Sequence, residues 1–355
     1  MLENSSAEPF IKLETQAAVH ATAQAADLSP LAEDSHRSPL TAPLSAIAQP
    51  LYFLCVNYHS AAFVSDLLHT LEDNQGIVIV NNSPADKSIH RLAASTFGGG
   101  AVTIIDAPDN GGFGAGCNLG LQWIYERSPQ AIVWVINPDA ALFSGAIAQV
   151  RQCLKHHSNI AILGTPVLDN QGKLWFASGR FNRWTGSVPS HIRVRSPRNI
   201  EQVQPLPTRW ITGCSIIFNL AQLKHCPQFD ETYFLYYEDC DLCERYFQQG
   251  YEIALLPIPL VVHAVSSITS RYVQAKFVYG TISKLIFLRR HATWLALILN
   301  LFYLSAKAIA ETFRRPLAAK GRWQGIWQFL KNPNPHPYVS ALDADKYSSQ
   351  ASSQR

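Results

Sequence analysis

Asp139 stands where a carboxylate could hold a divalent cation. It follows an unbroken apolar run, Ile132 to Ile136, which predicts a strand buried on both faces, and Pro138 ends that strand because proline has no N–H to donate. Ligands bind at the C-terminal edge of the strands in open α/β sheets, where a carboxylate can hold a cation that grips phosphates. Asn137-Pro138-Asp139 is also good turn chemistry, so this stretch alone leaves both interpretations open.

Polar side chains also follow three other predicted strands. Asn57 follows the apolar run 51–56, Asn81 follows the run 77–80, and Asn110 comes shortly after the run 101–105. Apolar residues at helical spacing over 61–71 complete a βαβ unit, which implies a parallel sheet with right-handed crossovers. Parallel strands would bring these asparagines and Asp139 to one edge of the sheet. Turn chemistry alone explains poorly why four strands should all be followed by such polar residues.

A glycine-rich turn runs from Asn110 to Asn118, before a helix predicted over 119–125. Glycines let the backbone approach an anionic ligand, and the N–H groups at a helix N-terminus favour phosphate. The spacing matches neither the dinucleotide fingerprint nor a P-loop, because no Gly-Lys-Ser/Thr follows. By itself such a stretch is more often only a turn.

Three acids, Glu238, Asp239 and Asp241, follow a dense aromatic cluster at 233–237. The dipole at a helix N-terminus favours acids and accounts for one or two of them. A carboxylate in a mostly apolar pocket tends to have a raised pKa and can act as a general base. His263 ends the apolar run 253–262, where it is either structural or a ligand for metal or phosphate.

Composition indicates a globular protein that does not bind nucleic acid. The chain has 355 residues, 47% of them hydrophobic, and its net charge of +3 is too mild to indicate a nucleic-acid partner. Seven scattered cysteines favour a reducing compartment, and Cys240 with Cys243 lacks the second pair that a zinc site would need. We expect no signal peptide, because a basic segment followed by an apolar core is absent from the N-terminus.

The chain divides into four predicted regions. Residues 1–49, rich in Ala, Ser, Pro and Thr, predict a disordered leader, and 332–355 a disordered tail. Residues 50–270 form the α/β domain, in which the stretch 164–207, with its aromatic residues, is either an irregular acceptor-side region or a loop with satellite packing. Residues 271–331 predict a basic and apolar helical region.

These residues, taken in order, resemble a family 2 glycosyltransferase of the rhamnosyltransferase-like group. The resemblance runs from Leu51 to His263 and rests on eight ordered pieces: Val56-Asn57-Tyr58, Val80-Asn81-Asn82-Ser83, Asn110-Gly111-Gly112-Phe113-Gly114 with Asn118, Asn137-Pro138-Asp139, Gly213-Cys214, Phe229-Asp230-Glu231, Tyr237-Glu238-Asp239-Cys240-Asp241 and Val262-His263. It implies the GT-A fold, with a Rossmann-like, mostly parallel central sheet flanked by helices. To this fold the chain adds its C-terminal helical extension.

The resemblance implies transfer of a sugar, with rhamnose a candidate, from a nucleoside diphosphate donor to an acceptor hydroxyl with inversion. Asp139 matches the acid of the family's metal-binding motif, which holds Mg²⁺ or Mn²⁺, although Asn137 stands where other members have a first Asp. His263 matches a histidine that completes the metal site in some relatives. Asp239 matches the catalytic base.

The same resemblance implies the residues on the two sides of the site. The donor side would comprise Asn57, Tyr58, Asn81, Asn110, Gly112, Asn118 and Asp139, and the acceptor side Trp210, Gly213, Cys214, Glu238 and Asp241. Asn81 departs from the Asp that many members place near the nucleobase, but its amide oxygen could accept from the N3–H of uracil or thymine. The expected partners are a dTDP- or UDP-sugar and a glycan or lipid-linked acceptor.

Beyond Arg271 the chain is strongly basic, with Glu311 as the single acid up to Lys331. The apolar run 292–304 is shorter than the roughly 20 residues of a spanning helix, and Asn300 interrupts it. Tryptophan, tyrosine and basic flanks favour a helix in the membrane interface, so we expect a cytoplasmic protein peripheral to the inner membrane face. A helix packed on the catalytic domain or in a dimer interface is the alternative.

Two other functions compete with transfer. A nucleotidyltransferase would need a basic glycine-rich loop for its triphosphate, and the segment 111–116 contains no Lys or Arg. The other alternative is a degenerate member of the family that binds sugar nucleotides or glycans without transferring a sugar. The presence of Asp139 and Asp239 argues against this alternative, whereas Asn81 and Asn137 favour it.

Overall fold

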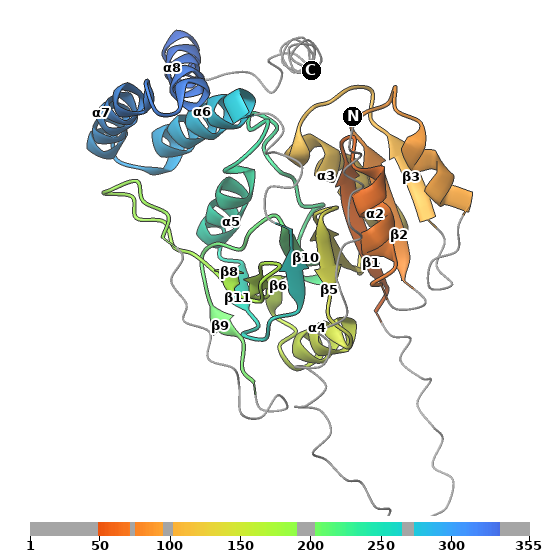
Figure 1. Ribbon diagram of the computed structural model, residues 1–355. Helices are drawn as coiled ribbons and strands as arrows, with labels where there is room; N and C mark the ends of the chain where they lie inside the picture. Colours follow the sequence, from red (N-terminus) through yellow and green to blue (C-terminus); the bar gives the residue numbers. More distant parts are fainter. Residues whose placement is uncertain (1–48, 72–74, 95–101, 190–202, 265–272, 334–355) are drawn as a thin grey trace, which may run out of the picture. The chain divides into compact units, whose positions relative to one another are not determined.

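An eight-stranded sheet is the centre of the chain (Figure 1). The computed structural model describes residues 49–71, 75–94, 102–189, 203–264 and 273–333. The sheet order is β3 (Val102–Asp106), β2 (Gly76–Asn81), β1 (Leu51–Asn57), β4 (Ile132–Ile136), β10 (Ser215–Asn219), β6 (Ile160–Gly164), β11 (Glu252–Leu255) and β9 (Leu206–Pro207). Only β10 and β9 run antiparallel to their neighbours. The predicted α/β class with a mostly parallel sheet is confirmed.

Helices cover both faces of this sheet because its strands are apolar on both. Along β1, Phe53 and Cys55 join the core beneath α2 (Ala61–Leu68) and α4 (Ala146–His156). Their neighbours Leu54 and Val56 join the opposite core, beneath α3 (Phe113–Arg127) and α5 (Glu238–Gln248). This alternation follows from the two-residue period of a strand. Two short 3₁₀ helices, η1 (Ser88–Ala94) and η3 (Leu220–Gln222), lie in the connections.

A second, smaller sheet brings two distant segments of the sequence together. Its strand order is β5 (Ala140–Leu142), β12 (Val261–His263), β7 (Val167–Leu168) and β8 (Leu174–Phe176). In its register His263 lies opposite Ala140, the residue after Asp139. The apolar run 253–262 is therefore two strands, β11 in the large sheet and β12 in the small one, and not one continuous strand.

Helix α3 starts earlier than the sequence pattern indicates. We expected a helix from Leu119, but it begins at Phe113, so Gly114 and Gly116 lie in its first turns. An added Cβ at Gly116 would meet Val56 at 2.8 Å, and at Gly120 it would meet Leu54 at 2.1 Å. These glycines allow α3 to pack closely on β1, which outweighs their low helix propensity.

Three helices follow the small sheet in the sequence: α6 (Val273–His291), α7 (Trp294–Glu311) and α8 (Pro316–Lys331). Residues of all three join Tyr233 and Cys240 in a third apolar cluster. Asn300 does not interrupt α7. Its buried amide donates to the carbonyl of Ala296 in the same helix, at 2.8 Å, and to that of Thr185, at 2.9 Å. The C-terminal helical extension is confirmed.

The expected leader and tail lie almost wholly outside the described residues, as does part of the region 164–207. All seven cysteines are described, and none forms a disulfide. Cys240 and Cys243 are both buried in α5, so they face the core as ordinary apolar side chains.

Candidate active site

The strand ends β1, β2 and β3 meet through their polar side chains, as expected for Asn57 and Asn81. The Asn57 amide donates to the Asn81 side-chain oxygen at 3.0 Å, and both side chains are fully buried. The Asn81 amide in turn donates to Asp106 Oδ1 at 2.7 Å. Asp106 was missed by the sequence argument, although it ends a predicted strand just as Asn57 and Asn81 do.

Asp106 is the negative charge of this edge. Its side chain is about one third exposed, at 36%. The hydrogen bond from Asn81 holds the pKa of Asp106 below its usual value, and His90 and Lys87 act in the same direction. Tyr58, one residue beyond the end of β1, lies half-buried with its ring against that of His59.

The glycine-rich turn is held from two sides. Asn82 donates to the carbonyl of Gly112 at 2.7 Å, and the side chain of Asn110 accepts from the N–H of Gly112 at 3.1 Å. Phe113 N–H donates to the carbonyl of Phe234 at 3.1 Å. Gly112 has φ +90°, and a Cβ there would meet that carbonyl oxygen at 2.1 Å, so only glycine fits. The side-chain oxygen of Asn82 is buried beside this turn without a hydrogen-bond partner.

Asn118 lies on α3 and engages the chain itself. Its amide donates to the carbonyl of Phe229 at 3.0 Å and to Glu231 at 2.9 Å, while its oxygen accepts from Phe229 N–H at 2.7 Å. Asn118 therefore holds the segment that leads toward α5.

Asp139 and His263 form the predicted pair at the junction of the two sheets. His263 Nε2 lies 3.0 Å from Asp139 Oδ1 and 3.5 Å from the amide of Asn137. The His263 ring packs against Trp175, with centroids 4.8 Å apart. Both Asp139 and His263 are buried, and His263 Nδ1 has no hydrogen-bond partner.

This pair fits a divalent cation in part. Adjacent ligands of an octahedral ion at about 2.1 Å are about 3.0 Å apart, which matches the spacing of His263 Nε2 and Asp139 Oδ1. Among the described residues no third His, Cys, Asp or Glu joins them. A bound ion would take its remaining ligands from phosphate oxygens and water, as Mg²⁺ commonly does.

Asp239 lies in the first turn of α5, half-buried and held by two backbone donors. Gly213 N–H donates to its Oδ2 at 2.8 Å, and Cys240 N–H donates to its Oδ1 at 2.7 Å. Burial raises the pKa of Asp239, while these donors and the indole of Trp210 oppose that rise. Tyr236 and Tyr237, just before α5, have φ +69° and +66°, a left-handed conformation that costs energy and fixes where the helix begins.

Gly213 and Cys214 connect the two acids of the site. Gly213 N–H binds Asp239, and the carbonyl of the next residue, Cys214, accepts from Asn137 N–H at 2.9 Å. The Cys214 thiol has a raised pKa through burial and through the charges of Asp139 and Asp239. The two carboxylates therefore lie on either side of one dipeptide.

Two residues expected on the acceptor side lie close to Asp239 with different surroundings. Trp210 packs edge-on against Phe176, with ring centroids 4.7 Å apart. Glu238 is buried, and its Cβ lies 3.8 Å from where a Cβ on Gly114 would stand. Burial and the neighbouring Asp239 raise the pKa of Glu238, whose Oε2 has no hydrogen-bond partner.

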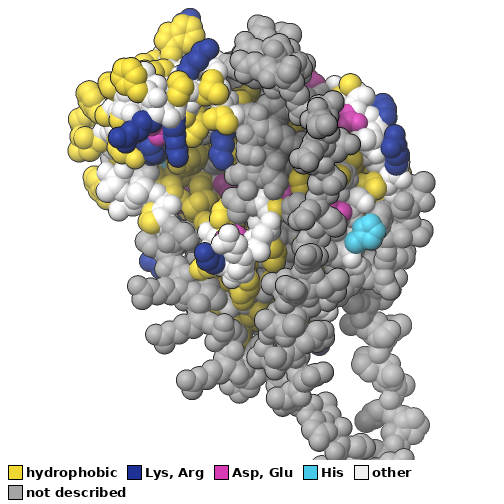
Figure 2. All heavy atoms as spheres, in the orientation of Figure 1, with side chains coloured by type: hydrophobic (Ala, Val, Ile, Leu, Met, Phe, Trp, Pro, Cys, Tyr) yellow, Lys and Arg dark blue, Asp and Glu magenta, His cyan; other side chains and the backbone are white. Residues whose placement is uncertain are grey.

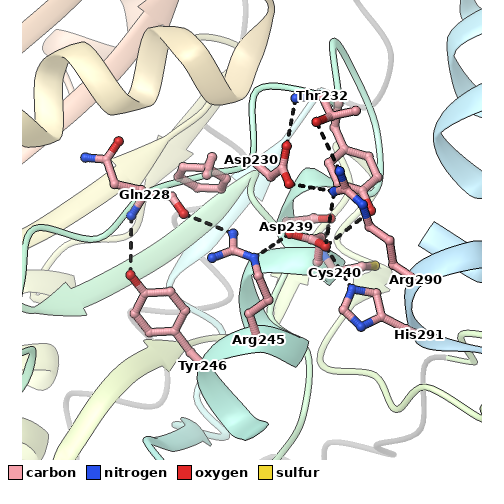
Figure 3. Close-up of polar contacts among 12 residues, drawn as sticks. Gln228, Asp230, Thr232, Asp239, Cys240, Arg245, Tyr246, Arg290 and His291 are labelled. Carbon is pink, nitrogen blue, oxygen red and sulfur yellow. Dashed lines mark hydrogen bonds and ion pairs between the residues drawn. The ribbon is translucent and has the colours of Figure 1, made fainter. Parts of the chain in front are cut away.

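Asp241 is the centre of a buried ionic network that joins α5 to α6, part of which is drawn in Figure 3. Its oxygens accept from Arg245 Nε at 2.6 Å, from His291 Nε2 at 2.8 Å and from the Tyr233 hydroxyl at 3.2 Å. Nearby, Arg290 pairs with Asp230 at 2.5 Å. The part of this network that joins α5 to α6 could not be predicted from local sequence patterns, because His291 lies fifty residues further along the chain than Asp241.

The sequence matches known proteins over about two thirds of its length. The model of the glycosyltransferase-like family 2 matches residues 49–277. The N-acetylglucosaminyl-diphospho-decaprenol L-rhamnosyltransferase of Mycobacterium tuberculosis is 23% identical over 254 residues, which cover 66% of this chain and 82% of that protein. The low-salt glycan biosynthesis hexosyltransferase Agl10 of Haloferax volcanii is 20% identical over 60% of this chain and 66% of its own.

Solved structures of other glycosyltransferases align more distantly. The mannosyltransferase PcManGT of Pyrobaculum calidifontis, in complex with GDP-Man and Mn²⁺, has 13% identity and a TM-score of 0.47, with 84% of this chain and 92% of that chain covered. GalNAc-T7 with UDP, GalNAc and Mn²⁺ has 10% identity and a TM-score of 0.49. That alignment covers 81% of this chain but only 57% of GalNAc-T7.

Proposed function

This chain belongs to the glycosyltransferase-like family 2, and from that premise we propose that it is an inverting enzyme that moves a sugar from a nucleoside diphosphate donor to an acceptor hydroxyl. In this reaction the acceptor oxygen attacks the anomeric carbon. The carbon–oxygen bond to the diphosphate breaks, and the hydroxyl proton passes to a base. One base is enough, because a direct displacement forms no covalent enzyme intermediate.

Asp239 is that base. The observation that carries the proposal is the placement of the Asp239 carboxylate. Gly213 N–H donates to it at 2.8 Å, and the carbonyl of the next residue, Cys214, accepts from the N–H of Asn137, two residues before Asp139. A base held this close to the expected donor phosphates can meet a hydroxyl aimed at the anomeric carbon. Its raised pKa makes it a better proton acceptor than an exposed aspartate.

The donor occupies the strand ends. Asn57, Asn81 and Tyr58 face the nucleoside, joined by Asp106, while Asn110 and Gly112 shape the turn beside the phosphates. Asp139 and His263 would hold Mg²⁺ or Mn²⁺, which supplies positive charge to the leaving diphosphate when bound. Asn118 contributes by holding the 229–231 segment in place.

The donor is a dTDP- or UDP-sugar, with rhamnose the first sugar to test, and the acceptor is a glycan or a lipid-linked glycan at the cytoplasmic side of a membrane. The support is the M. tuberculosis relative, whose name specifies a rhamnosyltransferase and a diphospho-decaprenol acceptor. Trp210, Gly213 and Cys214 border the acceptor side through their closeness to Asp239.

The test is nucleoside diphosphate release from a panel of dTDP- and UDP-sugars, with and without Mg²⁺ or Mn²⁺, using a membrane extract as the acceptor source. We expect metal-dependent release from one donor, and we expect Asp239→Asn to lower turnover at least about 100-fold while donor binding persists. Donor binding without turnover by the wild-type chain would indicate a sugar-nucleotide binding protein. Full activity of Asp239→Asn would refute the assignment of the base.

A further inference from the structure

Helix α7 exposes a broad apolar face. Only Ala296, Asn300, Leu304 and Ala308, spaced four residues apart, are buried along its length. Leu297 and Leu301 are partly buried against the third apolar cluster. Seven large hydrophobic side chains of α7 are exposed, among them Trp294 at 74% and Phe302 at 71%. The helix is apolar enough to be a candidate membrane span by length and composition, with a mean hydropathy of 1.3 over 18 residues, only 22% of which are buried. Such a face is unusual on a soluble monomer and requires a partner.

Helix α8 and the link to it continue this face. Phe313, between the two helices, is 96% exposed. On α8 the exposed residues Trp323, Trp327 and Leu330 repeat at helical spacing, whereas Ile326 and Phe329 are buried. Figure 2 shows hydrophobic side chains gathered over α7 and α8, with Lys and Arg side chains among them.

A turn from the catalytic region lies beside α7. Residues 182–187 form a tight turn closed by a bridge between Asn182 and Ser187, and Trp184 in this turn is exposed. Thr293 N–H donates to the carbonyl of Arg183 at 2.9 Å, and the Asn300 amide donates to that of Thr185, also at 2.9 Å. Trp184 is therefore fixed next to the first turn of α7.

The charges around these residues have one sign. Residues 273–331 contain ten Lys and Arg but one acid, Glu311, and that acid is paired with Arg322 at 2.8 Å. Arg290 is paired with Asp230. The Tyr303 ring lies between Lys284 and Lys307, whose Nζ atoms are 5.7 and 5.9 Å from its centroid. Five further cations are exposed on these helices: Arg289, Arg314, Arg315, Lys320 and Lys331.

We propose that the exposed residues of α7 and α8, together with Trp184, form a docking surface for an anionic lipid bilayer, which we call the α7–α8 surface. Aromatic and aliphatic side chains would enter the interface, and the unpaired cations would meet lipid phosphates. The absence of acids in this region other than Glu311 makes the match with an anionic surface better than with a second, equally basic copy of the chain.

The geometry favours lying on the membrane over crossing it. Helix α7 is about 27 Å long, slightly less than a hydrocarbon core of about 30 Å. Its buried stripe packs within the chain, and Asn300 at its middle is bonded to the 182–187 turn. A crossing helix would carry this polar contact into lipid.

The same turn connects the α7–α8 surface to Asp239, the proposed base. Gly179, three residues before the turn, forms an isolated bridge with Trp210. Three residues after Trp210, Gly213 N–H donates to Asp239 at 2.8 Å. The α7–α8 surface would thus hold the site close to an acceptor anchored in the membrane.

The experiment is flotation of the full chain with vesicles of phosphatidylcholine alone and of phosphatidylcholine mixed with phosphatidylglycerol, without any donor, so that the result is independent of transfer. We expect binding to the anionic vesicles that weakens with salt. The double variant Trp294→Gln and Phe302→Gln should weaken it about tenfold or more, and Arg314→Gln with Arg315→Gln about tenfold with a shallower salt dependence. Phe247→Gln, an exposed aromatic residue on α5, is the matched control and should bind like the wild type.

The proposal would be overturned by no flotation of the wild-type chain, by equal binding of the surface variants, or by a wild-type dimer that the Trp294 and Phe302 substitutions convert to monomers without any vesicle binding. Resistance of the bound protein to alkaline carbonate would contradict docking and support a spanning α7. Circular dichroism checks folding, and if the double variant is unfolded, Trp327→Gln with the arginine pair provides the same test.

Discussion

Asp139 Oδ1 and His263 Nε2 lie 3.0 Å apart although 124 residues separate them in the sequence. Antiparallel pairing of β5 with β12 in the small sheet creates this contact. The small sheet, whose residues Val167 and Val261 are buried in the core, thus positions Asp139 and His263 at a spacing that suits a shared ligand.

Replacing His263 by Gln should weaken metal-dependent donor binding about 10- to 100-fold, because the ion would lose one of two protein ligands or its orienting partner. Asp139→Ala should abolish the metal-dependent increase in donor affinity. Titration calorimetry of the donor with and without Mn²⁺ measures both. Asn137→Asp is the complementary variant. It adds a second carboxylate and should tighten metal binding. Unchanged metal-dependent donor affinity in all three variants would mean that the ion binds at another site.

The pH dependence of turnover should report Asp239. Burial raises its pKa, and only the ionised carboxylate can accept the acceptor proton. Turnover should therefore fall as pH decreases through a pKa above the ordinary value of about 3.9 for aspartate. A pH–rate profile at saturating donor and acceptor measures this. An acid limb at or below pH ~4 would contradict the raised pKa.

The Asp241 network should make the fold sensitive to acid. Burial alone would raise the pKa of Asp241, but His291 and Arg245 hold it below its usual value. A lowered pKa contributes stability above the unfolded pKa of about 3.9, and this stability is lost as pH falls through the folded pKa. Asp241→Asn should lower the free energy of unfolding by about 1–3 kcal/mol at neutral pH, because the donors of Arg245, His291 and Tyr233 lose a buried, charged acceptor.

Denaturant unfolding of Asp241→Asn at several pH values is the measurement, and the variant should lose less stability in acid than the wild type. Asp230→Asn is the control, since it breaks the more exposed pair with Arg290 and should cost about 1 kcal/mol or less. Equal losses in the two variants would mean that Asp241 is not the centre of the network.

Gly112→Ala should destabilise the protein more than Gly172→Ala. Both glycines have positive φ, +90° and +73°, so both substitutions carry a backbone cost of about 1–2 kcal/mol. A Cβ at Gly112 also meets Phe234 O at 2.1 Å, whereas nothing lies within 4 Å at Gly172. Thermal unfolding compares the two variants. Equal melting temperatures would show that the backbone at Phe234 moves away from the added Cβ at little cost in free energy.

Local patterns predicted the parallel half of the sheet, because its strands are continuous apolar runs. The same runs placed Asn57 beside Asn81, since parallel strands end at one edge. They did not predict that β10 lies antiparallel between β4 and β6, because an isolated apolar run carries no information on direction. Asp106 was not predicted, because an acid shortly before a glycine-rich turn is also ordinary turn chemistry.

The hydrogen-bond partners of the acids in α5 could not all be predicted, because some of them come from elements that are distant in the sequence. The sequence placed Asp239 at a helix start, which is where it lies. Asp241 was expected on the acceptor side, but its oxygens accept from Arg245 and His291, and the second of these belongs to a helix outside the resemblance. Helical periodicity gives the face of a side chain but not the partner that will cover it.

The family match ends at residue 277, four residues after α6 begins, whereas Arg290 and His291 near the end of that helix complete the ionic network of α5. The segment that matches the family model is therefore shorter than the segment whose side chains support the fold around α5. A chain shortened to the match would leave Asp241 buried with its His291 partner removed, and a chimera joined at that boundary would inherit the active site without its support. Exchange of C-terminal segments between relatives would have to carry α6 as well.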